Sequence, residues 1–135
     1  MRDIAERLIA HEASENNSPQ TISVVALLVD EKLRAHLATL MGNVGFRALL
    51  SRALVLTNAE VPWLRAVHVK GDGSLEGLEE LSAQVDPDEC FKGSIELLAQ
   101  LLGLLGTLIG ENLTLRLVHE IWPKLPLNDS DIGNG

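Results

Sequence analysis

The side chains whose types could do chemistry in this chain are four histidines, one cysteine and several neighbouring carboxylates. A zinc site uses about four His, Cys or carboxylate ligands, usually with two of them close together in the chain. His11 and His68 have no partner at such a spacing. Cys90 follows the acidic run DPDE, whose negative charge disfavours the reactive thiolate. We therefore expect no metal site, no cofactor and no catalytic cysteine.

Other catalytic patterns also fail on spacing. The segment from His68 to Glu79 partly fits a calcium-binding loop, but His68 and Lys70 occupy positions that require acidic ligands, so we interpret it as a turn. The glycines of segment 103–110 neither follow a strand nor end in Lys-Ser or Lys-Thr, as a phosphate-binding loop would. The paired carboxylates at 79–80 lie in a solvated acidic run. We predict no catalytic residue.

His36 lies in the segment RAHLATLMG, beside an apolar stripe through Leu37 and Leu40. This segment resembles the phosphoacceptor region of histidine phosphotransfer domains, which are also helical bundles. The resemblance covers this segment alone and implies that His36 would accept a phosphoryl group. Those domains carry Lys three residues and Gly four residues after the histidine, where this chain has Thr39 and Leu40. We expect a boundary histidine without a phosphoryl role, and keep a phosphoacceptor as the alternative.

His119 begins the run HEIWP, which resembles the His-Glu start of a sensor-kinase phosphoacceptor helix. After the next residue, which is Ile121 here, that helix continues with a basic residue, a small residue and Pro. In this chain Trp122 and Pro123 follow Ile121, so the Pro comes one position early. A chain of 135 residues has no room for a kinase ATP site. We expect His119 to share a solvated face with Arg116 and Glu120, which can pair at a spacing of four. Phosphorylation of His119 remains the alternative.

Length and composition limit the fold. A chain of 135 residues fits one domain and can bury roughly two thirds of its extended surface. Hydrophobic residues make up 46% and aromatic residues only 3%, so the core must be built from Leu, Ile, Val and Ala. This composition favours packed helices. We predict one all-α domain, a helical bundle over residues 1–126, and a polar tail over residues 127–135 that we expect to be disordered.

Charge sets limits on partners. The net charge of −8 at pH 7 would repel phosphate backbones, so we expect no nucleic-acid partner. Residues 32–70 contain six basic residues and one acid, whereas residues 71–96 contain eight acids and one base. We interpret these segments as two solvated faces of a bundle that attract one another. The alternative is a pair of complementary patches that dock copies of the chain.

The expected location is the cytoplasm. Nothing near the N-terminus resembles a signal peptide, because Asp3 and Glu6 interrupt any apolar run. The single cysteine, Cys90, excludes an internal disulfide. A cytoplasmic protein with a reduced thiol is the simplest interpretation.

Helical spacing of apolar residues predicts helices over 2–14, 46–57 and 111–122. Segment 19–41 is also helical in composition, but its apolar stripe turns near Asp30. Either one helix contacts different neighbours along its length, or a break near Asp30 lets this residue cap a second helix. The segment GNVG at 42–45 is typical of a connection.

One short β-hairpin near 66–76 is the exception to the helical pattern. Val67, His68 and Val69 alternate in polarity, and the turn signal KGDG follows them. A loop that leads into a helix is the alternative. A short helix within 75–84 is expected on the far side.

The segment IELLAQLLGLLGTLI, residues 95–109, is the most apolar in the chain. A helix that is apolar nearly all round belongs in a core, a subunit interface or a membrane. The run is shorter than the roughly 20 residues of a membrane span and includes Glu96, so we expect no membrane span. We predict that this helix is buried on almost every side, by the core of the bundle and by a partner.

Small residues interrupt the same segment at regular intervals, although a helical glycine costs roughly 1 kcal/mol. Either the small stripe lets another helix approach closely, or the helix kinks between Gly103 and Gly110, with Thr107 or Asn112 as a cap. Whether residues 95–122 form one helix or two is therefore open. The residues that we assign to helix packing or to an interface are Ala99, Leu101, Gly103, Leu104, Leu105, Gly106, Leu108 and Gly110.

Three functions are compatible with these patterns. The first is a non-enzymatic protein–protein interaction or regulatory module, acting as a homodimer or with another protein. It needs no special chemistry from any residue. A signalling domain phosphorylated on His36 or His119 is the second. The third is a protein that binds an apolar ligand between its helices, with the glycine stripe lining the pocket. We expect the first, because a twofold interface would cover the apolar surface that the short helices leave exposed.

Overall fold

The computed structural model describes residues 2–15 and 22–125. Four longer helices build the bundle: α1 (Arg2–Glu15), α2 (Ile22–Asn58), α4 (Pro87–Ile109) and α5 (Glu111–Ile121). A 3-10 helix, η1 (Pro62–Ala66), the strands β1 (His68–Val69) and β2 (Leu75–Glu76), and the short helix α3 (Leu78–Ser82) connect α2 to α4. The predicted all-α fold with one short hairpin is confirmed.

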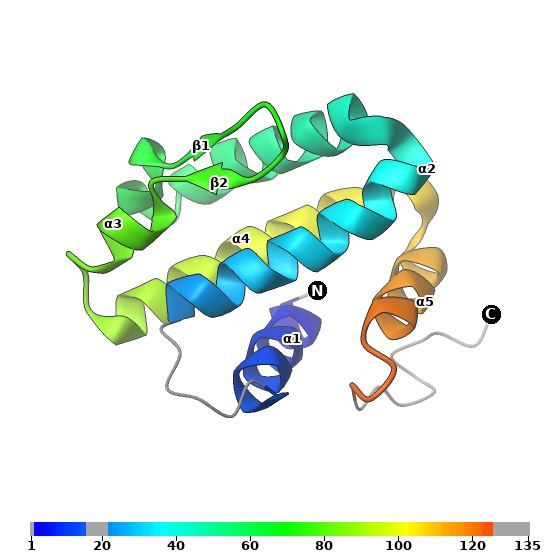
Figure 1. Cartoon of the computed structure of the whole chain (residues 1–135), viewed down its shortest axis with the longest axis horizontal. Coiled ribbons are helices and arrows are strands. Elements are labelled where there is room, and N and C mark those ends of the chain that lie inside the picture. Colours follow the sequence, from blue (N-terminus) through cyan, green and yellow to red (C-terminus); the bar gives the residue numbers. More distant parts are fainter. Residues whose placement is uncertain (1, 16–21, 126–135) are drawn as a thin grey trace.

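The central helix is α4, and the other elements surround it (Figure 1). It packs against α1, α2 and α5. Pro87 in the first turn, with Asp88 and Glu89 beside it, gives α4 a favourable start, because Pro needs no hydrogen bond there and acids stabilise a helix N-terminus. The hairpin and α3 lie beside the second half of α2 in Figure 1.

Gly42 divides α2 into two arms. The backbone is helical through Asp30, so the alternative in which Asp30 caps a new helix is not what the chain adopts. Gly42 instead takes φ 76° and ψ 165°, a conformation that residues with a Cβ rarely adopt. The predicted connection over 42–45 is thus a kink at one residue. It folds the two arms of α2 back along each other (Figure 1).

Gly110 makes the second break. It separates α4 from α5 with φ 94° and ψ 150°, so residues 95–122 form two helices. Neither Thr107 nor Asn112 caps α5: no side-chain cap bond is made at its N-cap, Gly110, and the Thr107 hydroxyl donates instead to the carbonyl oxygen of Gly103 over 3.1 Å.

The hairpin forms where it was predicted. Strands β1 and β2 pair antiparallel, with His68 opposite Glu76 and Val69 opposite Leu75. The predicted tail over 127–135 lies outside the described residues.

The core combines the apolar stripes of every element. On α1, which begins and ends close to the predicted helix 2–14, the apolar stripe of Ile4, Ala5, Leu8 and Ile9 is buried. Among the largest side chains with almost no exposed surface are Phe46, Leu33, Leu37, Leu50, Leu64, Leu78, Leu102 and Leu105. Leucine dominates this core, with a few valine, isoleucine and alanine side chains, as the composition predicts.

One side of α4 remains uncovered toward its C-terminal end. Leu98, Leu101, Leu102 and Leu105 are buried, whereas 65% of the Leu108 side chain is exposed. By length and composition alone, one helix of the described part, Asp88–Ile109, could cross a membrane, but the core helix of a bundle meets the same test. The expectation that this segment is buried on almost every side therefore holds within one chain for residues 93–102, none of which is exposed, but not for the end of α4, where Gly103, Thr107 and Leu108 are exposed.

Candidate functional site

The two candidate phosphoacceptor histidines, His36 of α2 and His119 of α5, are exposed. His36 of α2 lines a surface hollow together with Leu40, Leu117 of α5 and Glu120 of α5. The Thr39 hydroxyl, also in this hollow, donates to the carbonyl oxygen of Ala35 over 3.3 Å. An acidic side chain beside His36 would repel a phosphoryl group, so the hollow does not favour phosphotransfer.

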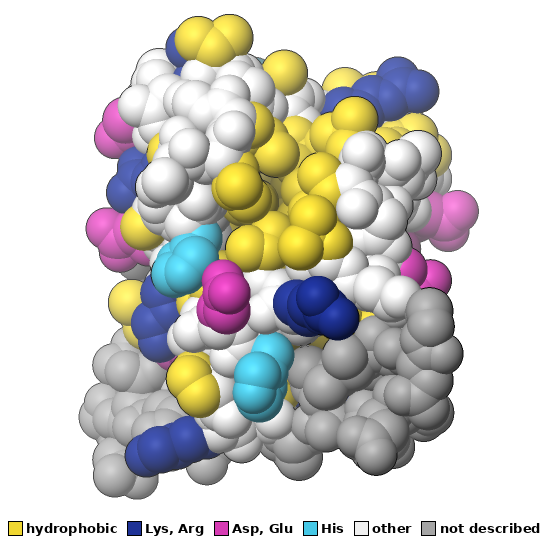
Figure 2. Space-filling model, turned by 90° about the vertical axis from the view of Figure 1, so that its right-hand side faces the viewer, with side chains coloured by type: hydrophobic (Ala, Val, Ile, Leu, Met, Phe, Trp, Pro, Cys, Tyr) yellow, Lys and Arg dark blue, Asp and Glu magenta, His cyan; other side chains and the backbone are white. Residues whose placement is uncertain are grey.

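An apolar end surface is the most prominent exposed feature nearby. The kink of α2, the end of α4 and the start of α5 meet at the right-hand end of the molecule in Figure 1. Figure 2 views this end, and hydrophobic side chains gather across its centre, with charged and histidine side chains beside them. The large exposed hydrophobic residues of these segments are Leu40, Val44, Leu108 and Leu113, exposed by 59%, 75%, 65% and 47%. We call these four residues the apolar end surface.

The residues assigned to packing or an interface divide between the core and the surface. Leu101 and Leu105 are buried in the core, whereas Ala99, Leu104 and Gly106 are half-buried. Gly103, Leu108 and Gly110 are exposed. A Cβ added at Gly103 would meet nothing within 4 Å. No helix of the described chain therefore approaches the small stripe at Gly103.

Charges of both signs border the apolar end surface. Arg116 and Glu111 line a shallow hollow with Leu113, and Glu120 lines the neighbouring hollow with Leu40. Arg116 and Glu120 are exposed, as predicted for the polar face of α5, and Glu111 is exposed as well. These border residues can therefore pair with a surface that carries positive and negative charges in a similar arrangement.

A second feature is internal and was not found from the sequence. Asp30 and Ser94 are buried, with 7% and 5% of their surface exposed, and they line a cavity of about 30 Å³ among aliphatic side chains. Burial raises the pKa of Asp30 to about 7, against the lowering effect of Arg34. The sequence signal that could have indicated a buried acid here is the position of Asp30 within a mostly apolar helical segment.

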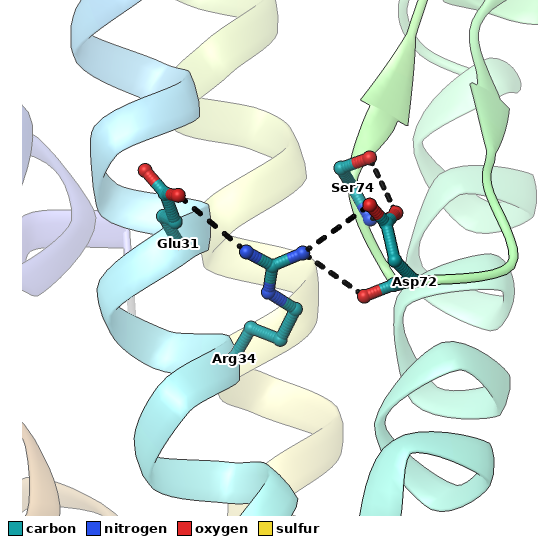
Figure 3. A network of polar contacts seen from close by, with 4 residues as sticks. All are labelled: Glu31, Arg34, Asp72 and Ser74. Atoms are coloured by element: carbon teal, nitrogen blue, oxygen red, sulfur yellow. Dashed lines mark hydrogen bonds and ion pairs between the residues drawn. The ribbon is translucent and has the colours of Figure 1, made fainter.

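Arg34 fastens the hairpin turn to α2 (Figure 3). Its Nη1 donates to the carbonyl oxygen of Asp72 over 2.9 Å, and its Nη2 lies 3.5 Å from a carboxylate oxygen of Glu31. Hydrogen bonds from the hydroxyl and amide of Ser74, over 2.6 and 3.0 Å, lower the pKa of Asp72. Arg34 and Asp72 belong to the basic and the acidic segment, so these segments contact each other within one chain.

A buried carboxylate ties the two ends of the chain together. Glu12 of α1 is 2% exposed and accepts hydrogen bonds from Trp122 and Lys32 on the same oxygen. Burial raises the pKa of Glu12, but the hydrogen bonds from Lys32 and Trp122 together outweigh this effect. The pKa of Glu12 is therefore below its usual range. Glu12 lies four residues after Leu8, on the apolar side of α1. This position is the sequence signal that could have indicated a buried acid that needs a partner.

The described residues contain no group of three or more His, Cys, Asp or Glu side chains arranged to hold a metal ion. Cys90 is buried and forms no disulfide. No protein-family model, curated protein or solved structure matches the chain significantly. Function must therefore be inferred from the surfaces and buried groups described above.

Proposed function

We propose that the protein is a non-enzymatic interaction module that associates with a second copy of itself through the apolar end surface. The observation that carries the proposal is the exposure of Leu40, Val44, Leu108 and Leu113 together at one end of the bundle. Soluble monomers rarely leave large contiguous apolar patches in water. A partner that covers these side chains would remove that cost.

A second copy is the occupant that the border charges favour. A twofold interface places the same patch on both partners, so each residue must find its match on the same surface. With Arg116, Glu111 and Glu120 around the patch, a rotated copy can oppose a base to an acid. A partner with a uniformly charged surface would meet a like charge somewhere on this border.

The small stripe of α4 supports the same partner. Gly103 is exposed, and no described residue of the same chain lies within 4 Å of a Cβ placed on it. Small side chains on a helix permit close contact with another helix. In the proposed dimer, α4 of one copy would approach α4 of the other near Gly103, and Leu108 would be buried beside it.

Sedimentation equilibrium of the unmodified chain and of Leu108→Glu tests the proposal. Burial of one leucine is worth roughly 1.5–3 kcal/mol, so the substitution should weaken dimerisation by at least about tenfold. Val55→Glu is the matched control, because Val55 is 60% exposed but lies about 16 Å from Val44 along the same arm of α2.

Val55→Glu should leave the association constant unchanged. A monomer mass for the unmodified chain at high micromolar concentration would refute the proposal, as would equal effects of the two substitutions. Leu101 and Leu105 are unsuitable for this test, because they are buried in the core and a charge there would unfold the chain.

A further inference from the structure

The internal cavity lies among α1, α2, η1, β2, α3 and α4. Its wall is almost entirely aliphatic and includes Leu33, Leu64, Leu97 and Leu101. The volume of about 30 Å³ gives room for roughly two water-sized groups. A purely apolar cavity of this kind would need no explanation, because small voids occur in most cores.

Two polar side chains in the wall have no partner. The Oδ1 atom of Asp30 and the Oγ atom of Ser94 are buried, and neither has a hydrogen-bond partner among the described residues. Both residues are more than nine-tenths buried. Buried polar atoms are nearly always hydrogen-bonded, so two such atoms in the wall of one cavity indicate a missing occupant.

The arginine that acts on Asp30 is already engaged. Arg34 lies close enough to Asp30 to lower its pKa, but its guanidinium binds the carbonyl of Asp72 and faces Glu31. Glu31 and Asp72 both act on Asp30 in the opposite direction, because like charges disfavour its ionised form. Burial is the main reason that the pKa of Asp30 is raised, so a cation inside the cavity would stabilise the ionised form of this carboxyl group.

We propose that the cavity binds a short primary alkylammonium ion, with its charged group held by Asp30 and Ser94 and its carbon chain against the leucines. An ammonium group has three donors and no acceptor, which suits a carboxylate oxygen and a hydroxyl oxygen as partners. Methylammonium and ethylammonium have two and three heavy atoms, which matches the small volume. The site is independent of the apolar end surface and does not rest on dimerisation.

The probe for the test is ethylammonium chloride, added to the ¹⁵N-labelled chain at pH 8, with ethanol and sodium chloride as comparisons. The amide resonances around Ser94 and Asp30 should shift and saturate with ethylammonium, whereas ethanol and sodium chloride should produce no saturable shift. Butylammonium, which exceeds the volume, should bind at least tenfold more weakly. Below pH 7 the affinity for ethylammonium should fall about tenfold for each pH unit, because Asp30 becomes protonated.

Asp30→Asn should reduce the affinity for ethylammonium at least tenfold, and Ser94→Ala should reduce it several-fold. Asp88→Asn is the control, because it removes the same charge from an exposed position on α4 and should not change the affinity. Equal binding of ethanol and ethylammonium, or unchanged binding in both cavity variants, would overturn the proposal. So would the absence of any saturable shift, which would mean that the cavity holds water alone.

Discussion

The indole Nε1 of Trp122 donates a hydrogen bond of 2.6 Å to the carboxylate of Glu12, and so joins the end of α5 to the end of α1. Lys32 of α2 donates to the same carboxylate oxygen. The helices α1, α2 and α5 therefore meet at one buried acid. A hydrogen bond to a charged group contributes about 1.5–3 kcal/mol, which makes this contact a substantial part of a small domain's stability.

Trp122→Phe should lower the free energy of unfolding by about 2–3 kcal/mol, measured by urea denaturation at pH 7. The substitution removes one of the hydrogen-bond donors to the buried Glu12 carboxylate, while the bond from Lys32 remains. Trp63→Phe is the matched control, because the buried Nε1 of Trp63 has no partner to lose among the described residues. Equal losses in the two variants would mean that ring volume, not the hydrogen bond, determines the effect.

Glycines at two positions of the bundle should respond to alanine in opposite directions. Gly42→Ala should destabilise by about 1–3 kcal/mol, because φ 76° with ψ 165° is strained for any residue with a Cβ. Gly103→Ala should stabilise the monomer by up to about 1 kcal/mol, because Gly103 is helical and a Cβ would meet no neighbour. Thermal unfolding at low concentration measures both effects.

The same Gly103→Ala variant should dimerise more weakly if the small stripe is buried between copies as proposed. Sedimentation equilibrium at several concentrations gives this second quantity. A variant that is more stable and dimerises as well as the unmodified chain would place the stripe outside the interface.

Asp30 should make the protein less stable as the pH rises from about 4 to 7. Its pKa is 3.8 when unfolded and about 7 when folded, so the folded state holds the proton more tightly within this window. The unfolded state ionises first, and stability falls by as much as about 4 kcal/mol, at about 1.4 kcal/mol for each pH unit. Above pH 7 the penalty is constant.

Asp30→Asn should abolish this dependence and raise the stability at pH 8 relative to the unmodified chain. The difference between the two unfolding curves at pH 4.5 and pH 8 isolates Asp30 from Glu31, Asp72 and the other titrating groups. If Asp30→Asn differs in stability from the unmodified chain by the same amount at pH 4.5 and at pH 8, then Asp30 is ionised at both pH values and has a compensating partner.

Arg34→Gln should loosen the hairpin turn without much loss of global stability. Both acidic partners of Arg34 are 66% exposed, and exposed ion pairs contribute less than about 1 kcal/mol. Hydrogen exchange at the amides of Lys70 and Gly73, which bond within the turn, should become several-fold faster. Arg47→Gln, on the other arm of α2, should leave these amides unchanged, and equal acceleration in both variants would contradict the role of Arg34.

The sequence by itself determined the elements of this protein. Helical periodicity located α1, the second arm of α2 and α5, because the spacing of apolar residues is a property of a few neighbouring turns. The hairpin followed from the turn signal at 70–73 for the same reason. Glycines marked both helix breaks, although periodicity did not decide between a break and a close helix contact at Gly110.

Tertiary structure alone decided which faces meet. Periodicity assigns Glu12 to the apolar side of its helix, but the choice of Trp122 as its partner depends on how α1 and α5 cross α4. The same is true of Asp30 with Ser94, and of His36 with Glu120. Such pairs are far apart in the chain, and whether their members lie near each other depends on the summed packing of every helix between them. The exposure of Leu108 has the same origin, because burial of α4 ends where α1 and the two arms of α2 no longer cover it.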